Sequence, residues 1–66
     1  MFVYFSDMNA DYIYNAKHIH SIIRKPNTDY FTIAFTDDMM KTFKFDGSKI
    51  ARETYFDILK RLQEVF

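Results

Sequence analysis

The chain has 66 residues, and its nine basic and nine acidic side chains give a formal net charge of +0. A single domain of this size buries only about 60% of the surface that its unfolded chain exposes, so its stability is marginal. The absence of cysteine excludes disulfides and thiolate metal sites. The charge balance excludes a global field that would attract nucleic acid or an anionic membrane.

The aromatic content is high, with eight phenylalanines and five tyrosines. A small domain has too little interior for so many rings, so several should lie on a surface, where rings usually meet a partner. Small domains also gain support from disulfides, metals or self-association. Because the chain has no cysteine, self-association is the simplest remaining support, with tight packing as its rival.

Turn signals divide the first two thirds of the chain into short runs rich in β-branched and aromatic residues, which predict strands. The turn segments are 6–11, 26–29, 37–38 and 46–48. The predicted strands are 2–5, 12–14, 18–24, 30–36 and 40–45. Short turns favour hairpins, so we expect antiparallel pairing between neighbours.

Alternation is clearest in the last two strands, which each have an apolar and a polar side. The side expected to face the core holds Phe31, Ile33, Phe35, Phe43 and Phe45. The side expected to face outward holds Tyr30, Thr32, Ala34, Thr36, Thr42 and Lys44.

The run 18–24 alternates less cleanly, because Ile22 and Ile23 must face opposite sides. We expect Ile19 and Ile23 to face the core. The outward side would then carry His18, His20, Ile22 and Arg24.

A helical period begins after Gly47, with Ser48 as the expected cap of a helix over about 49–66. Its apolar arc holds Ile50, Ala51, Tyr55, Ile58, Leu59, Leu62, Val65 and Phe66. Phe56 lies among polar residues outside this arc, so its ring should be partly exposed. The fold class predicted for the single domain 1–66 is α+β, a small antiparallel meander sheet of four to five strands packed on one C-terminal helix.

Catalytic and cofactor signatures are missing from the sequence. It has no glycine-rich phosphate loop and no nucleophile motif, which indicates a non-enzymatic protein without a cofactor. Asp37 and Asp38 are adjacent at a turn and are expected to serve it. The weak metal candidates are His18 and His20, which would share one side of a strand but lack a sequence-defined third ligand.

The function that the sequence favours is a small interaction protein that self-associates through aromatic surface as a homodimer or larger species. Such a module could regulate or inhibit a larger protein partner. The expected interface residues are Phe56, Leu59, Phe66 and Tyr30. The alternative is a single-stranded DNA or RNA binder that uses the open sheet face, with Tyr30, Lys44, Arg24 and His20 as its contacts.

The sequence has no run near the roughly 20 apolar residues that a membrane span needs. Its apolar first five residues are too short for a secretory signal and lack a basic start. We therefore expect a soluble protein without a membrane partner, and the absence of cysteine favours the cytoplasm.

Overall fold

Five antiparallel strands precede one long helix in a molecule of 28 × 23 × 21 Å. The computed structural model describes the backbone of residues 1–65 and the side chains of residues 1–63. The elements are β1 (Phe2–Ser6), β2 (Asp11–Asn15), the 3-10 turn η1 (Ala16–His18), β3 (Ile19–Ile23), β4 (Tyr30–Phe35), β5 (Met40–Lys44) and α1 (Ser48–Val65). The predicted α+β class is confirmed.

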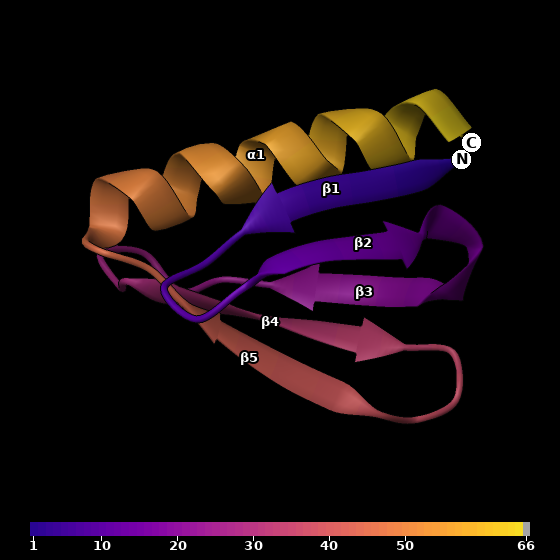
Figure 1. The fold of residues 1–66 in the computed structure, drawn as a ribbon, viewed down its shortest axis with the longest axis horizontal. Helices are drawn as coiled ribbons and strands as arrows, with labels where there is room; N and C mark the ends of the chain where they lie inside the picture. The colour runs from indigo at the N-terminus through magenta and orange to yellow at the C-terminus, as the bar shows by residue number, and fades with distance from the viewer. Residues whose placement is uncertain (66) are drawn as a thin grey trace.

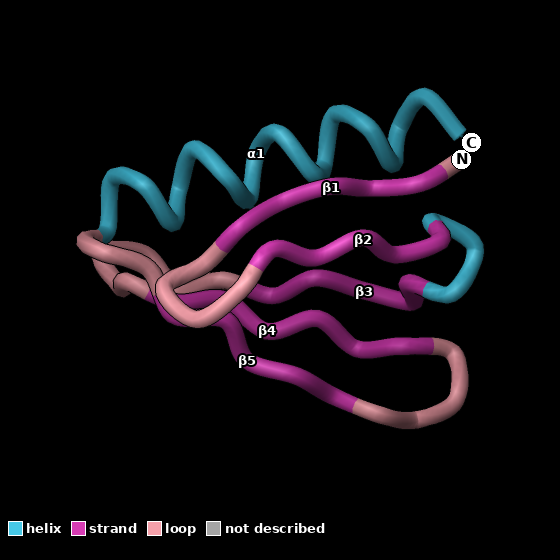
Figure 2. Tube along the Cα trace, in the orientation of Figure 1, coloured by secondary structure: helices cyan, strands magenta, loops and turns pink. Residues whose placement is uncertain are grey.

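The strands are divided into two sheets, a β1–β2 hairpin and a β3–β4–β5 meander (Figure 1). The division lies between β2 and β3, where η1 takes the place of a hairpin turn (Figure 2). The side chain of Asn15 caps η1 by accepting a hydrogen bond from the backbone N–H of Lys17 at 3.0 Å. This compact corner lets the hairpin fold over the meander instead of extending it.

Aromatic rings fill the space between the two sheets. The ring of Phe5 on β1 lies 4.9 Å from that of Phe43 on β5 and 5.8 Å from that of Phe31 on β4, measured between centroids. Tyr14 on β2 lies 5.0 Å from Phe35 on β4. At one end a backbone hydrogen bond of 3.1 Å from the N–H of Met8 to the carbonyl of Lys44 ties the hairpin turn to β5.

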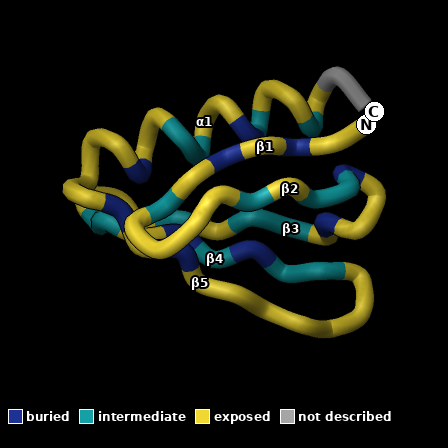
Figure 3. Tube along the Cα trace, in the orientation of Figure 1, coloured by how far each residue is buried: buried dark blue, intermediate teal, exposed yellow. Residues whose placement is uncertain are grey.

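The helix α1 closes the core by packing against β1 and β4 (Figures 1 and 3). Ala51 and Ile58 on this side of the helix are fully buried, and the ring of Tyr55 lies 6.2 Å from that of Phe31. The inward residues predicted for β4 and β5 are confirmed, with Phe31, Ile33, Phe43 and Phe45 buried and Phe35 half-buried. They are covered jointly by the helix and the hairpin, and not by the helix alone.

The helix begins one residue earlier than predicted. Ser48 is its first residue, and the first helical bond runs from the N–H of Ala51 to the carbonyl of Gly47 at 3.3 Å. Gly47 therefore holds the capping position that the sequence predicted for Ser48. Its φ of 108° is a conformation that glycine adopts without steric cost.

The predicted orientation of β3 is wrong beyond Ile19. Ile19 pairs with Phe35, but Ser21 pairs with Ala34, so an extra residue is inserted at this point of the ladder. Such a β-bulge inverts the alternation that follows it. Ile22 accordingly packs against the core, while Ile23 is 53% exposed.

Candidate interaction surfaces

The outer face of the β1–β2 hairpin carries large apolar side chains. Phe2 and Tyr4 on β1 are 52% and 59% exposed, and Ile13 on β2 is 55% exposed. Tyr4 and Ile13 are directly paired across the ladder, and Phe2 is two residues from Tyr4 on the same side. We call Phe2, Tyr4 and Ile13 the hairpin patch. It is contiguous and contains no charged group.

Strand alternation explains why this patch exists. Val3 and Phe5 point to the core, so their neighbours in β1 must point to solvent. A solvated antiparallel face usually carries polar residues. The sequence did not reveal the patch because residues 2–5 are all apolar and offer no contrast between the two sides.

A second surface lies on the helix around Phe56, which is 50% exposed, as predicted. The guanidinium of Arg52 lies 5.4 Å from the centroid of the Phe56 ring, and the ring of Tyr55 meets it edge-on at 5.3 Å. Leu59 follows Phe56 by three residues in the helix, about one turn, and is half-buried. We call Phe56 with Arg52 and Leu59 the helix patch. Phe66, the other helix residue predicted for this interface, lies outside the described residues.

Tyr30 belongs to another surface. Phe31 faces the helix, so Tyr30 points to the opposite side of the meander. There it is paired with Lys44, and the neighbouring hydroxyls of Thr32 and Thr42 are hydrogen-bonded to each other at 3.0 Å. We call Tyr30, Thr32, Thr42 and Lys44 the open sheet face. The residues predicted as one interface are thus placed on two different surfaces.

The residues predicted for nucleic-acid contact are brought together only in part. Tyr30 and Lys44 are directly paired, and His20 lies near Ala34 at the other end of β4, where both line a shallow pocket of about 180 Å³. Arg24 follows β3, and its Nε is buried without a hydrogen-bond partner among the described residues. The Arg24 side chain as a whole is half-buried.

The two histidines do not lie on one strand as predicted, because His18 belongs to η1 and only His20 belongs to β3. His18 lies in η1 and lines a pocket of about 360 Å³ with Tyr14, Asp37 and Met39. His20 lines a separate pocket, which shares with the first the wall formed by Phe35 and Thr36. Within residues 1–65, no three His, Cys, Asp or Glu side chains are grouped so as to hold a metal ion.

The acidic pair at the β4–β5 turn serves the turn, as expected. The Oδ1 of Asp37 accepts a hydrogen bond from the backbone N–H of Met39 at 3.1 Å. Asp38 adopts a positive φ of 68°, a conformation that aspartate tolerates better than most residues. The Asp37 carboxylate and the Asp38 backbone thus both serve the turn.

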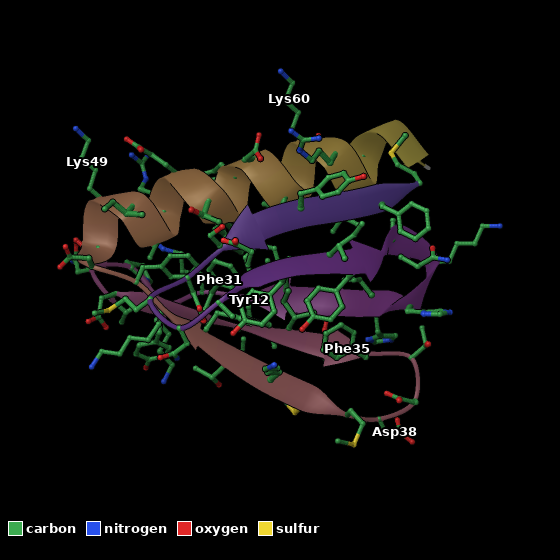
Figure 4. All side chains as sticks on the ribbon, viewed as in Figure 1. Tyr12, Phe31, Phe35, Asp38, Lys49 and Lys60 are labelled. Carbon is green, nitrogen blue, oxygen red and sulfur yellow. The ribbon has the colours of Figure 1, made fainter. Side chains whose placement is uncertain are left out.

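Tyr12 closes the gap between the hairpin and β5, where Figure 4 shows its ring between the two strands. The Nζ of Lys41 lies 4.8 Å from the centroid of this ring, and the Tyr12 hydroxyl donates to the Oδ2 of Asp7 at 3.3 Å. Loss of solvent around the hydroxyl and the neighbouring Asp7 carboxylate raise the pKa of Tyr12. The group is held in its neutral form and acts as a structural contact.

Comparison with protein families, with curated proteins and with solved structures finds no match for this chain. The described part of the chain contains no helix both long and apolar enough to cross a membrane. The function is therefore inferred from the hairpin patch, the helix patch and the open sheet face.

Proposed function

We propose that this protein is a small non-enzymatic interaction module that self-associates by burying aromatic surface between copies. The hairpin patch carries the proposal, because three large apolar side chains lie together on one uncovered face. Scattered exposed apolar residues are ordinary, whereas a contiguous patch indicates a contact site. Association with another copy can serve to regulate or inhibit a larger protein.

The energetic case rests on the size of the domain. Eleven large apolar side chains are exposed among the described residues. Each square ångström of apolar surface removed from water contributes about 25 cal/mol. A domain with marginal stability gains more from this burial than a large protein would, since binding stabilises the folded state.

The helix patch is the second surface open to this proposal. Phe56 presents a half-exposed ring, but Arg52 already lies against it. Burying this pair would require part of the guanidinium to lose water, which opposes association. The hairpin patch has no such cost, and we therefore place the contact between copies there. A cytoplasmic location, expected from the cysteine-free composition, stays part of the proposal.

Light scattering coupled to size-exclusion chromatography across a dilution series tests the proposal. The expected result is a dimer or larger species that dissociates on dilution. Tyr4→Thr should shift the midpoint of dissociation to a concentration at least about tenfold higher, since central interface rings are worth about 2 kcal/mol or more. A monomer at every concentration contradicts the proposal.

A second candidate function is the binding of single-stranded nucleic acid. One observation favours it: Tyr30 is directly paired with Lys44 on the open sheet face, next to Thr32 and Thr42. A ring beside a cation is the arrangement that holds single-stranded nucleic acid by stacking and phosphate contact. Oligonucleotide affinity should then fall with salt. Tyr30→Ala should weaken it by about 1–3 kcal/mol, with Tyr4→Ala as the matched control on the other sheet. No binding at low salt ends this alternative.

A further inference from the structure

We propose that the larger pocket, between the end of β2 and the β4–β5 turn, binds a small organic ammonium ion. We call it the turn pocket, and its lining residues are Tyr14, His18, Phe35, Thr36, Asp37 and Met39. This inference does not depend on the proposed self-association. Tyr14 is paired with buried Val3, so it lies on the inner side of the hairpin, opposite to Tyr4 and Ile13 of the hairpin patch.

The turn pocket is built by three segments that are distant in the sequence. Tyr14 comes from β2, His18 from η1, and the other lining residues from the end of β4 and the turn that follows it. Figure 4 shows Phe35 near the end of β4 from which this turn starts. The volume of about 360 Å³ is at the lower end of the range of roughly 300–1,000 Å³ for small-molecule sites. The pocket therefore suits a small ligand.

Aromatic side chains line much of the turn pocket. The rings of Tyr14 and Phe35 lie 5.0 Å apart between centroids, at an interplanar angle of 46°. The face of an aromatic ring carries partial negative charge and attracts cations. The thioether of Met39 adds a soft, polarisable contact for alkyl groups. These residue types together favour a cation that has an apolar surface.

Asp37 brings a formal negative charge to the same pocket. Its Oδ1 accepts the hydrogen bond from the backbone N–H of Met39, and its Oδ2 accepts none from the described residues. The described side chains provide no ion-pair partner for Asp37, and the pocket lining contains no lysine or arginine. A neutral ligand would take water from this carboxylate without compensation, whereas a cation compensates its charge.

The neighbouring ring on β2 already holds an ammonium group of the chain itself. The Nζ of Lys41 lies 4.8 Å from the centroid of the Tyr12 ring, whose hydroxyl donates to Asp7. The Tyr14 ring is nearly parallel to that of Tyr12, with an interplanar angle of 10° and 6.0 Å between centroids. Among the described residues, no lysine or arginine lies over the Tyr14 ring. An external ammonium ion would give Tyr14 the contact that Lys41 gives Tyr12.

An NMR titration of the ¹⁵N-labelled full chain with choline, at constant ionic strength, tests the proposal. The matched control ligand is dimethylbutanol, in which carbon replaces the ammonium nitrogen. Choline should cause saturable shifts of the backbone amides of residues 36–39 and leave those of Phe2, Tyr4 and Ile13 unchanged. It should bind at least about threefold more tightly than the alcohol, since a cation on a ring gains roughly this factor.

Two adjacent acidic residues separate the charge of the pocket from that of the turn. Asp37→Asn removes the charge but keeps an oxygen that can accept from the Met39 N–H, and it should weaken choline binding about threefold. Asp38→Asn is the matched control, because Asp38 lines the other pocket and asparagine tolerates its positive φ. It should change choline affinity by less than about 1.5-fold.

Substitutions of the rings separate aromatic from merely apolar contact. Phe35→Leu keeps an apolar wall without a ring, so the preference for choline over dimethylbutanol should fall toward one. Tyr14→Phe should retain this preference, because phenylalanine keeps the ring face. Circular dichroism checks that both variants are folded. Asp37 is exposed, so Asp37→Asn tests the pocket even if Phe35→Leu does not fold.

Several results would overturn the assignment. These are the absence of saturable shifts, equal affinity for choline and dimethylbutanol, and equal losses in Asp37→Asn and Asp38→Asn. A trimethyllysine peptide that binds at least about tenfold more tightly than choline would assign the pocket to a protein side chain instead of a small ion. A monomer in light scattering contradicts self-association and leaves the ammonium site standing.

Discussion

Phe43 of β5 meets Phe5 of β1 edge to face, with 4.9 Å between ring centroids and an interplanar angle of 82°. This contact joins the first strand of the chain to the last. Tyr12 adds a second edge-on ring, 4.9 Å from Phe43. Phe43, which is fully buried, therefore contacts rings from both strands of the hairpin.

Phe43→Ala should cost about 3–5 kcal/mol of unfolding free energy, the range for removing a buried ring. A domain of this length has a total stability of roughly 3–10 kcal/mol, so the variant should be largely unfolded. Urea unfolding followed by circular dichroism measures this. Phe43→Leu should keep the fold with a smaller loss. A loss under about 1 kcal/mol for Phe43→Ala would contradict the packing.

The bulge in β3 predicts opposite behaviour for two adjacent isoleucines. Ile22→Thr should lower the unfolding free energy by about 1–2 kcal/mol, since it replaces an apolar contact of the core by a hydroxyl. Ile23→Thr should change it by less than about 0.5 kcal/mol, because Ile23 is exposed. Threonine is β-branched in both cases, so strand propensity is matched. Equal losses would argue against the bulge.

The start of the helix can be tested with another adjacent pair. Gly47→Ala should cost about 1–2 kcal/mol through backbone strain alone, because φ is 108° and an added Cβ would meet no atom within 4 Å. Ser48→Ala should cost less than about 0.5 kcal/mol, since Ser48 lies inside the helix. Thermal unfolding of both variants shows whether Gly47 or Ser48 holds the capping position. If Ser48→Ala costs about 1 kcal/mol and Gly47→Ala nothing, Ser48 is the cap.

Two ring substitutions distinguish the two apolar surfaces. Tyr4→Thr should convert the self-associated species to monomer, whereas Phe56→Asp should leave its mass unchanged, because Phe56 lies on the helix patch. Both side chains are at least half exposed, so the fold should survive both changes. Light scattering gives the mass, and circular dichroism checks the fold. The reverse pattern would move the interface to the helix.

Alkaline pH should destabilise the protein through Tyr12. Its pKa is raised in the folded state by loss of solvent and by Asp7, so folding favours the neutral hydroxyl. This contribution is complete below about pH 10, the ordinary tyrosine value, and is lost as pH rises through the higher folded pKa. Melting temperatures between pH 8 and 11 should fall less steeply for Tyr12→Phe than for Tyr4→Phe. Identical slopes would contradict the role of Asp7.

The local pattern of the sequence was sufficient for the secondary structure and part of the core. Alternation in β4 and β5 predicted the buried Phe31, Ile33 and Phe43, because the side-chain period of a strand is a property of the backbone. The helical period likewise predicted that Phe56 would be exposed. These features depend only on residues within a few positions of each other.

Other features were decided by contacts between distant segments. The division into two sheets follows from the packing of Phe5 and Tyr14 on the meander, which local alternation cannot specify. The bulge before Ser21 inverted Ile22 and Ile23 because strand register depends on the partner strand. The hairpin patch has the same origin. Either side of β1 is apolar enough to be buried, and the contacts of the assembled fold bury Val3 and Phe5 and leave Phe2 and Tyr4 exposed.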